Sequence, residues 1–345
     1  MKTCLWSADS NLLTKAGRLL REGKLVAFPT ETVYGLGANA LDGQAVARIF
    51  QAKGRPQDNP LITHIYTFDQ MEEYGQNISS LAWKLARTFW PGPLTLIVEN
   101  RGIISPVVNA GLDSLSLRMP EHPVALALLR EAGVPVAAPS ANLSGHPSPT
   151  AAQHVWDDLQ GKIEAIIDGG ACSIGLESTV LDVRGEVPVI LRPGAITPEQ
   201  IRILAGQVAL DSTLLNPVCT TQKPLAPGMK YRHYAPKAPL FLWEGAASRI
   251  PVEISRQAQE AVQRGQKVGI WGLVQNQAFY PSEAVFLSSG SDLPAERAAA
   301  LYAALREMDR LGVDLILVEG LEPHGLGLAV ENRLRKAAAK IISLS

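Results

Sequence analysis

The stretch KLVAFPTETVYGLGANA, residues 24–40, joins a short apolar run to a segment crowded with hydroxyl groups and glycines. The run KLVAF has the length and composition of a buried β-strand, and the proline after it ends the strand. Gly35, Gly37 and Ala40 can be forced onto a dinucleotide-binding fingerprint, but PTETVY intervenes where that fingerprint places its first glycine. No nicotinamide-type cofactor is therefore expected, and the hydroxyl groups at this strand end need another explanation.

Apolar runs of strand length recur over the first 205 residues or so, separated by segments with helical spacing. Hydrophobic residues recur at helical spacing over 12–20 and, less cleanly, over 124–129. The sequence TPE at 197–199 predicts a helix N-cap with proline in the first turn. Residues 1–210 are predicted to form one large α/β domain with a mixed, twisted sheet. Its strands are expected at KLVAF, PLITHI, PLTLIV, SLSLR, VPVAA, EAIID, STVLDV and PVILR.

The composition and the hydrophobic pattern of the sequence change after residue 210. Residues 216–240, NPVCTTQKPLAPGMKYRHYAPKAPL, are rich in proline and show no convincing period of 2 or 3.6. Their second half carries lysines, an arginine and a histidine but no carboxylate. These features predict a linker over residues 211–238.

Beyond the linker, strand-like runs alternate with helical patterns. Strands are expected at LFLWEG, KVGIWG and DLILVEG, with helices near 251–264 and 294–311 and a last helix ending near Lys340. Strands that alternate with helices are typical of a parallel sheet, because parallel strands need a long crossover connection. Residues 239–345 are therefore predicted to form a smaller, Rossmann-like α/β domain.

The composition excludes several classes of protein. The 345 residues suit two domains, and 46% of them are hydrophobic, as in ordinary globular proteins. With a net charge of -1, no global field draws the chain toward nucleic acid or a membrane. Cys4, Cys172 and Cys219 are too far apart and too few for a disulfide framework or a cysteine-rich metal site. This cysteine usage fits a reducing compartment. No apolar run is long enough to span a membrane, and a cytoplasmic location is expected.

One polar cluster lies in the segment AKGRPQDNPLITHI. Lys53, Arg55 and Asn59 occupy a proline-broken loop, and His64 lies on the strand that follows. Such charges are most often ordinary surface residues, and in isolation this loop would be read that way. The clusters described next change that reading.

Two arginines stand at the ends of predicted strands. Arg118 ends SLSLR and Arg192 ends PVILR, each directly before a residue pair that contains proline. Side chains at strand ends face the crevice beyond the sheet, where α/β proteins tend to bind ligands. The guanidinium fork suits the two oxygens of a carboxylate or phosphate, although a structural salt bridge is the competing explanation.

Hydroxyl groups cluster at the ends of two further predicted strands. In VPVAAPSANLSGHPSPT the strand leads into Ser140, Asn142, Ser144 and Ser148, with Thr150 placed to cap the next helix. Such a loop can hold polyphosphate through hydroxyl, amide and backbone N–H groups, although a plain polar turn is the alternative.

Another such group lies at the start of STVLDV, where Ser178 and Thr179 follow a glycine-containing loop. No P-loop, His-Glu-x-x-His, Gly-x-Ser-x-Gly or paired Asp-x-Asp motif is present. Cations and hydroxyls without an obvious general base favour phosphoryl or nucleotidyl transfer, in which the protein supplies position and charge neutralisation.

Taken in order, these segments resemble the YrdC-like family of threonylcarbamoyl-AMP synthases. The linker motif and the small second domain resemble the long, two-domain form of that family, and no motif departs from its pattern. The motifs that carry the resemblance are PTETVYGLG, KGRPQDNPL, SLRMP, APSANLSG, ESTV, LRPG and PGMKYRHYAP.

The resemblance implies an enzyme that joins L-threonine, bicarbonate and ATP into L-threonylcarbamoyladenylate and releases pyrophosphate. Its product would serve the threonylcarbamoyladenosine modification of tRNA, with the transfer done by separate downstream proteins. Binding of tRNA is not required for the synthase step. Mg²⁺ is expected on the ATP phosphates, with no ligand from protein side chains.

The resemblance also implies roles for individual residues, with the linker folding over the active site. Ala138 is expected to contribute through its backbone alone. The residues expected to bind threonine are Thr32, His64, Arg118, Ala138 and Ser178. The residues expected to bind ATP are Lys53, Arg55, Asn59, Ser140, Asn142, Ser148, Arg192, Tyr231 and Tyr234.

Two other functions are compatible with parts of the sequence. A related domain takes part in carbamoyl transfer during hydrogenase maturation, but those proteins are much longer and carry paired C-x-x-C zinc modules, which this chain lacks. An RNA-binding protein could use a basic concave surface. The net charge of -1 and the aromatic content of 6% make such a surface less expected.

Overall fold

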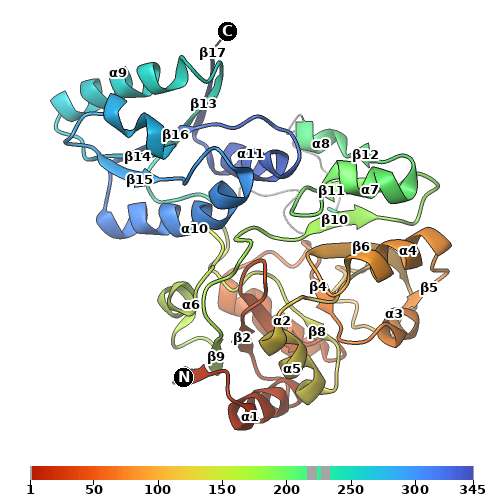
Figure 1. Ribbon diagram of the computed structural model, residues 1–345. Helices are drawn as coiled ribbons and strands as arrows, with labels where there is room; N and C mark the ends of the chain where they lie inside the picture. The colour runs from red at the N-terminus through yellow and green to blue at the C-terminus, as the bar shows by residue number, and fades with distance from the viewer. Residues whose placement is uncertain (1, 216–223, 227–233, 345) are drawn as a thin grey trace. The chain divides into compact units, whose positions relative to one another are not determined.

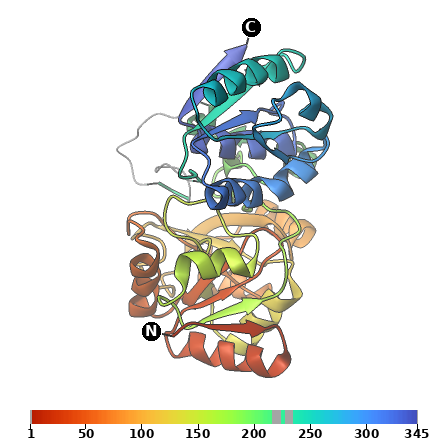
Figure 2. The ribbon, with the colours of Figure 1, turned by 90° about the vertical axis from the view of Figure 1, so that its left-hand side faces the viewer.

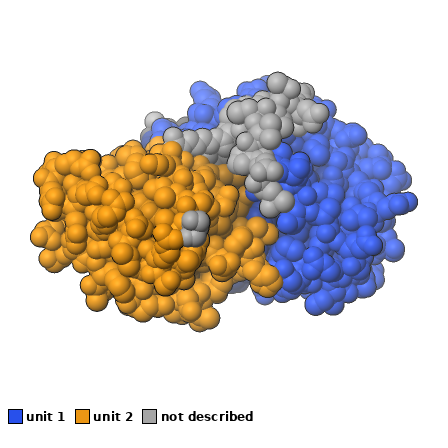
Figure 3. Space-filling view, turned by 90° about the horizontal axis from the view of Figure 1, so that it is seen from above, with its two compact units in different colours: residues 1–144, 148–231 blue, residues 145–147, 232–345 orange. Residues whose placement is uncertain are grey.

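The computed structural model describes residues 2–215, 224–226 and 234–344 (Figure 1). The described residues form two compact units, the first within 1–144 and 148–231 and the second within 145–147 and 232–345 (Figure 3). Much of the predicted linker lies outside the described residues, and its limits stay a prediction. Ala226 is buried with Ile97, Val180 and Leu191 of the first unit.

The described part of the first unit contains one mixed sheet of twelve strands. These strands are β1 (Cys4–Ser7), β2 (Val26–Phe28), β3 (Gly35–Asn39), β4 (Ile62–His64), β5 (Gly75–Gln76), β6 (Leu94–Asn100), β7 (Ser114–Arg118), β8 (Val136–Ala137), β9 (Ala165–Asp168), β10 (Thr179–Asp182), β11 (Val189–Arg192) and β12 (Ala209–Leu210). Their order is β1-β9-β2-β3-β8-β4-β7-β6-β10-β11-β12, and β5 pairs with β6. Each of the eight strands predicted for this region is present.

Helices cover both faces of this sheet (Figure 2). They are α1 (Ser10–Arg21), α2 (Gly43–Lys53), α3 (Asp69–Tyr74), α4 (Ser80–Phe89), α5 (Pro123–Ala132), α6 (Ala152–Leu159), α7 (Pro198–Ala205) and α8 (Ser212–Leu215). Leucines and alanines of α1 and α5 pack on one side against β2 and β9. The buried faces of α2, α4, α6 and α7 contribute to the larger core. Helices α1 to α7 each bury apolar residues, which stabilises the unit through the hydrophobic effect.

Capping residues set the ends of several helices. Thr197 caps α7 in a complete capping box, as its sequence predicts. The prediction for Thr150 is wrong, because α6 begins after Ala151 and has no side-chain cap. The Thr150 N–H donates instead to Nδ1 of His154, 3.2 Å away, which ties the residue before the N-cap to the first turn of α6.

The second unit is built on a parallel sheet of five strands among its described residues, in the order β15-β14-β16-β13-β17. Its elements are β13 (Leu240–Gly245), α9 (Ile250–Gln263), β14 (Val268–Gly272), the 3-10 helix η1 (Val274–Phe279), β15 (Val285–Ser288), α10 (Pro294–Leu311), β16 (Leu315–Glu319), α11 (Leu326–Ala337) and β17 (Lys340–Leu344). The last helix was expected to reach Lys340, but it ends at Ala337 and an unpredicted strand follows. None of the described helices combines the length and hydropathy needed to cross a membrane.

Candidate active site

Five polar side chains lie along one edge of the larger sheet. β4 and β7 run parallel, and His64 at the end of one is the register partner of Arg118 at the end of the other. β6 starts at this edge because it is antiparallel to β7, and β10 runs parallel to β6. β11 is antiparallel to β10 and ends there at Arg192. Strand direction alone therefore brings His64 and Arg118 to the same edge as Thr95, Ser178 and Arg192.

Arg118 forms a buried ion pair, the competing explanation that the sequence left open, and its partner Glu31 was not predicted. Its guanidinium donates to Oε1 of Glu31 at 2.7 Å, and the two residues are only 4% and 5% exposed. Its Nε donates more weakly to the carbonyl of Gly92, 3.4 Å away. Glu31 lies in the loop between β2 and β3, between two threonines of the motif PTET. An acidic residue inside a motif already expected to bind ligand was the signal that could have identified it.

Thr32 is fully buried beside a second threonine. The Thr30 hydroxyl donates to the carbonyl of Val33 at 2.6 Å, and the two threonine Oγ1 atoms are 2.8 Å apart. Since Thr30 uses its proton on Val33, the Thr32 hydroxyl must be the donor between them. Thr32 therefore keeps acceptor capacity for a ligand, and Thr30, which was not predicted, fixes its orientation.

His64 is buried and electrically neutral. Burial, and then the charge of Arg118, lower the pKa of its imidazole to about 3. The ring lies edge-on to Phe28 with centroids 6.0 Å apart, and its Nδ1 has no hydrogen-bond partner. A neutral imidazole at this position can hydrogen-bond a ligand without adding charge.

Lys53 holds together the hydroxyl-rich loop after β8. Its ammonium donates to the carbonyl oxygens of Ser140 and Asn142, each at 2.5 Å. The Ser140 hydroxyl donates in turn to Oδ1 of Asn142 at 2.6 Å. Ser140 also forms an isolated bridge with Gly35 at the start of β3. Three residues expected to bind ATP are thus brought together from separate parts of the chain.

The residues assigned to threonine and to ATP meet at Ser178. Arg192 donates from Nε to the Ser178 carbonyl and from Nη2 to its hydroxyl, both at 3.0 Å. The same hydroxyl lies 2.8 Å from Oγ1 of Thr95. The neighbouring Glu177, which was not predicted, accepts a 2.5 Å hydrogen bond from Ser148. Ser148, Ser178 and Arg192 consequently form one connected group.

Arg55 and Asn59 lie together in the loop before β4. The Arg55 guanidinium donates to the carbonyls of Asn59 and Pro60 at 3.4 and 3.2 Å. Asn59 is only 1% exposed, yet neither polar atom of its amide has a hydrogen-bond partner. Buried amides are normally satisfied, so this side chain is suited to a ligand. Ala138 is also buried, and its N–H is committed to the carbonyl of Ile62 at 2.9 Å.

Of the two tyrosines expected to bind ATP, Tyr234 alone lies within the described residues. Tyr231 lies outside the described residues. Tyr234 belongs to the second unit, where its ring packs against Tyr302 with centroids 5.4 Å apart and beneath the guanidinium of Arg333. The ATP role of both tyrosines stays a prediction.

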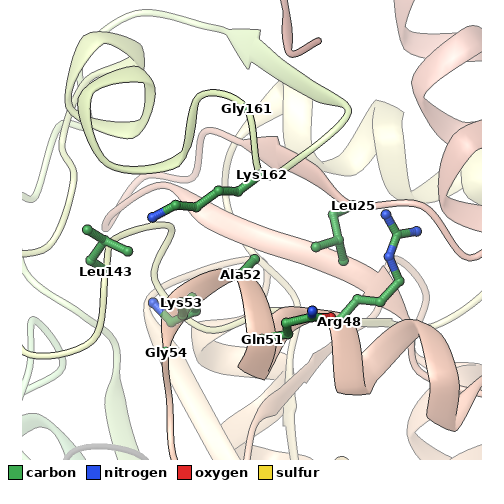
Figure 4. A pocket seen from close by; sticks show the side chains of 9 residues that line it. All are labelled: Leu25, Arg48, Gln51, Ala52, Lys53, Gly54, Leu143, Gly161 and Lys162. Carbon is green, nitrogen blue, oxygen red and sulfur yellow. The ribbon is translucent and has the colours of Figure 1, made fainter. Parts of the chain in front are cut away.

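A hollow of about 610 Å³ lies beside α2 (Figure 4). Figure 4 shows Lys162 directed toward Leu143 across it, with Arg48 on the opposite side. Arg48 is paired with Glu164 at 2.6 Å, and Lys162 donates to the carbonyl of Asp158 at 3.4 Å. We assign no ligand to this hollow, because the three cations that line it, Arg48, Lys53 and Lys162, already have protein partners.

The fold is that of a two-unit α/β protein in which buried cationic and hydroxyl side chains gather at one edge of the larger sheet. A family model of Sua5, YciO and YrdC proteins, described as "Telomere recombination", matches residues 18–194. A second model, described as "Threonylcarbamoyl-AMP synthase, C-terminal domain", matches residues 196–339. The chain belongs to the threonylcarbamoyl-AMP synthase family.

Relatives match over the full length of the chain. The threonylcarbamoyl-AMP synthase of Bacillus subtilis is 48% identical over 348 residues, which cover 98% of each chain. That of Pyrococcus abyssi is 50% identical over 323 residues, covering 94% of this chain and 93% of that protein. A crystal structure of P. abyssi Sua5 complexed with L-threonine superimposes with a TM-score of 0.94 at 46% identity and covers all of both chains. These matches confirm the predicted family and fold class.

Proposed function

We propose that the protein is a nucleotidyltransferase that makes L-threonylcarbamoyladenylate from L-threonine, bicarbonate and ATP and releases pyrophosphate. The observation that carries this proposal is the strand edge on which Arg118 and Arg192 flank Ser178. One guanidinium suits a carboxylate and the other a phosphate. The names of the full-length relatives and the threonine complex of one of them support the same function.

We propose that threonine binds at Arg118, with the neutral imidazole of His64 and the hydroxyl groups of Ser178 and Thr32 as further partners. Arg118 takes the carboxylate of the substrate, since a buried guanidinium gains most from an anionic partner. Thr32 offers acceptor lone pairs, and His64 and Ser178 add hydrogen bonds without adding charge. The backbone around Ala138 closes this side of the site.

ATP binds along the cationic and hydroxyl-rich part of the same unit. Its phosphate charge is neutralised by cations and by neutral donors, which are Lys53, Arg55, Asn59, Ser140, Asn142, Ser148 and Arg192. Among the described residues, no group of three histidine, cysteine, aspartate or glutamate side chains is arranged to hold a metal ion. We propose that Mg²⁺ arrives on the phosphate oxygens of ATP, as this ion usually does. Tyr231 and Tyr234 of the linker are proposed to complete the nucleotide site.

The chemistry requires little covalent work from the protein. Threonine and bicarbonate give a carbamate, whose oxygen attacks the α-phosphorus of ATP and displaces pyrophosphate. Orienting the two substrates and shielding their negative charges supplies the rate enhancement. The adenylate product then serves threonylcarbamoyladenosine modification of tRNA by separate transferase proteins, so the synthase step does not need tRNA.

Pyrophosphate release measured with each component omitted in turn tests this function. We expect release only when ATP, L-threonine, bicarbonate and Mg²⁺ are all present. Release that continues without threonine or without bicarbonate contradicts the proposed substrates.

A further inference from the structure

One oxygen of the Glu31 carboxylate accepts a hydrogen bond, and the other is buried without one. Oε1 accepts the 2.7 Å hydrogen bond from Arg118, whereas Oε2 is buried and has no hydrogen-bond partner. The Glu31 backbone is fixed as well, because its carbonyl accepts the N–H of Ile174 at 2.8 Å and the hydroxyl of Ser173 at 3.4 Å. A buried carboxylate oxygen without a donor is costly. The side chain is therefore rigidly placed to accept a hydrogen bond from a ligand.

The charges around this carboxylate select the kind of ligand. Arg118 and Glu31 cancel each other, and burial keeps their neighbours neutral. Burial lowers the pKa of His64 to about 3, lowers that of His122, and raises that of the Cys172 thiol to about 12. A ligand carboxylate on Arg118 alone would leave one uncompensated negative charge in a buried site, which is strongly unfavourable. A zwitterionic amino acid, whose ammonium faces Oε2, leaves the site neutral.

We propose that Glu31 binds the ammonium group of threonine through Oε2 and accepts a proton from it when the carbamate forms. This inference rests on the proposed function. Arg118 then has two contacts at once, the substrate carboxylate and Oε1 of Glu31. Glu31 is not among the residues that the sequence predicted to bind threonine or ATP.

The proposed step balances in atoms and charge. The ammonium gives one proton to Glu31, and the freed nitrogen lone pair forms a bond to the bicarbonate carbon. The carbon–hydroxyl bond of bicarbonate breaks, and the leaving hydroxide takes a second proton from nitrogen to become water. Ammonium, carboxylate and bicarbonate thus give carbamate, protonated Glu31 and water.

A purely structural role is the alternative, in which Glu31 only positions Arg118. The two roles differ for 3-hydroxybutanoate, a threonine analogue that keeps the carboxylate and hydroxyl but lacks the ammonium. If Glu31 binds the ammonium, replacing Glu31 weakens the binding of threonine alone. If Glu31 only positions Arg118, replacing it weakens the binding of both ligands alike.

Calorimetric titration of the full chain with L-threonine and with 3-hydroxybutanoate separates these roles. For Glu31→Gln we expect roughly a ten- to hundredfold loss of threonine affinity, the usual effect of losing one charge-assisted hydrogen bond. Affinity for 3-hydroxybutanoate should stay the same or rise, because a buried negative charge is removed. Glu164→Gln, which breaks the remote ion pair with Arg48, should change neither affinity.

Equal losses for both ligands in Glu31→Gln would overturn the inference while leaving the proposed function intact. Should that variant fail to fold, the wild-type protein still provides the test. It must bind threonine at least about tenfold more tightly than 3-hydroxybutanoate, and equal affinities would overturn the role of Glu31. If the wild-type protein neither binds threonine nor releases pyrophosphate, the proposed function itself is wrong.

Discussion

The ion pair between Arg118 and Glu31 places two opposite charges in the interior of the first unit. Taking both groups out of water is costly, and their attraction offsets that cost only while both are present. Either charge left alone would destabilise the fold. The pair therefore holds each side chain in a fixed position before any substrate binds.

This dependence predicts an unequal response to mutation. Arg118→Met should lower the free energy of unfolding by about 3–5 kcal/mol, because the Glu31 charge stays buried without its partner. Adding Glu31→Gln to the same chain should recover part of that loss. Urea unfolding of the wild type, both single variants and the double variant, without threonine, measures the coupling. Strictly additive losses would show that the two charges do not depend on each other.

For single residues, the sequence predicted where a side chain lies in the fold better than which side chain it contacts. Arg118 and Arg192 were expected at strand ends and lie at the ends of β7 and β11. A salt bridge of Arg118 was the competing explanation from the sequence, but its partner Glu31 was not foreseen, because it lies 87 residues away and no local pattern marks such a contact. The same holds for Glu177, which is 29 residues from Ser148.

Secondary-structure elements deliver the cations to the site. The carboxylate of Asp42 accepts the N–H groups of Gln44 and Ala45 at the start of α2, and Gly54, with φ +62°, ends it directly after Lys53. The hairpin of β10 and β11 delivers Arg192, and Gly194 follows it in close contact with the β10 backbone. The ends of these elements, rather than their interiors, position the charges.

Gly194 gives a prediction for this hairpin. A Cβ at this position would lie 2.3 Å from the backbone nitrogen of Thr179, so alanine must push the strands apart and displace Arg192. Gly194→Ala should lower stability by about 1–3 kcal/mol and raise the ATP concentration needed for half-maximal pyrophosphate release several-fold. Gly185→Ala in the same hairpin is the matched control, since its Cβ would meet only Val187 O at 3.7 Å. Equal effects of the two substitutions would contradict this account.

Strands rich in β-branched residues were predictable, whereas β3 was not. Its sequence GLGAN has low strand propensity, and tertiary packing requires glycine there. A Cβ at Gly37 would lie 2.9 Å from Val136 and 3.0 Å from Phe28. The short, exposed β17 was missed for a different reason, since it follows a helix without a strong stop signal.

The whole molecule combines a large mixed sheet and a small parallel sheet, each within its own unit. A cavity of about 220 Å³ lies at the carboxyl ends of β13 and β16. Glu244 of β13 lines it together with Glu331 and Arg335 of α11. Burial, and then the hydrogen bond with Glu244, raise the pKa of Glu331 to about 8. The folded second unit therefore keeps a proton that an unfolded chain releases near pH 4.5.

This difference predicts how the second unit responds to pH. Because the folded state binds more protons between pH 4.5 and about 8, its stability should fall as pH rises through that window. Glu331→Gln should remove that loss and raise the melting temperature at pH 9 relative to the wild type by several degrees. Glu307→Gln is the control, since its pKa is lowered by Arg310 and it causes no loss at high pH. The measurement is the melting temperature of each variant from pH 5 to pH 9. Parallel curves of melting temperature against pH for the wild type and Glu331→Gln would refute the prediction.

The central claim is that cations and hydroxyl groups distant in sequence converge on threonine and a triphosphate. A crystal structure of the full chain with L-threonine and a non-hydrolysable ATP analogue tests it most directly. We expect the threonine carboxylate on Arg118, its ammonium on Glu31, and the triphosphate against Lys53 and Arg192. Threonine bound away from Arg118, or the two ligands in separate hollows, would contradict the account.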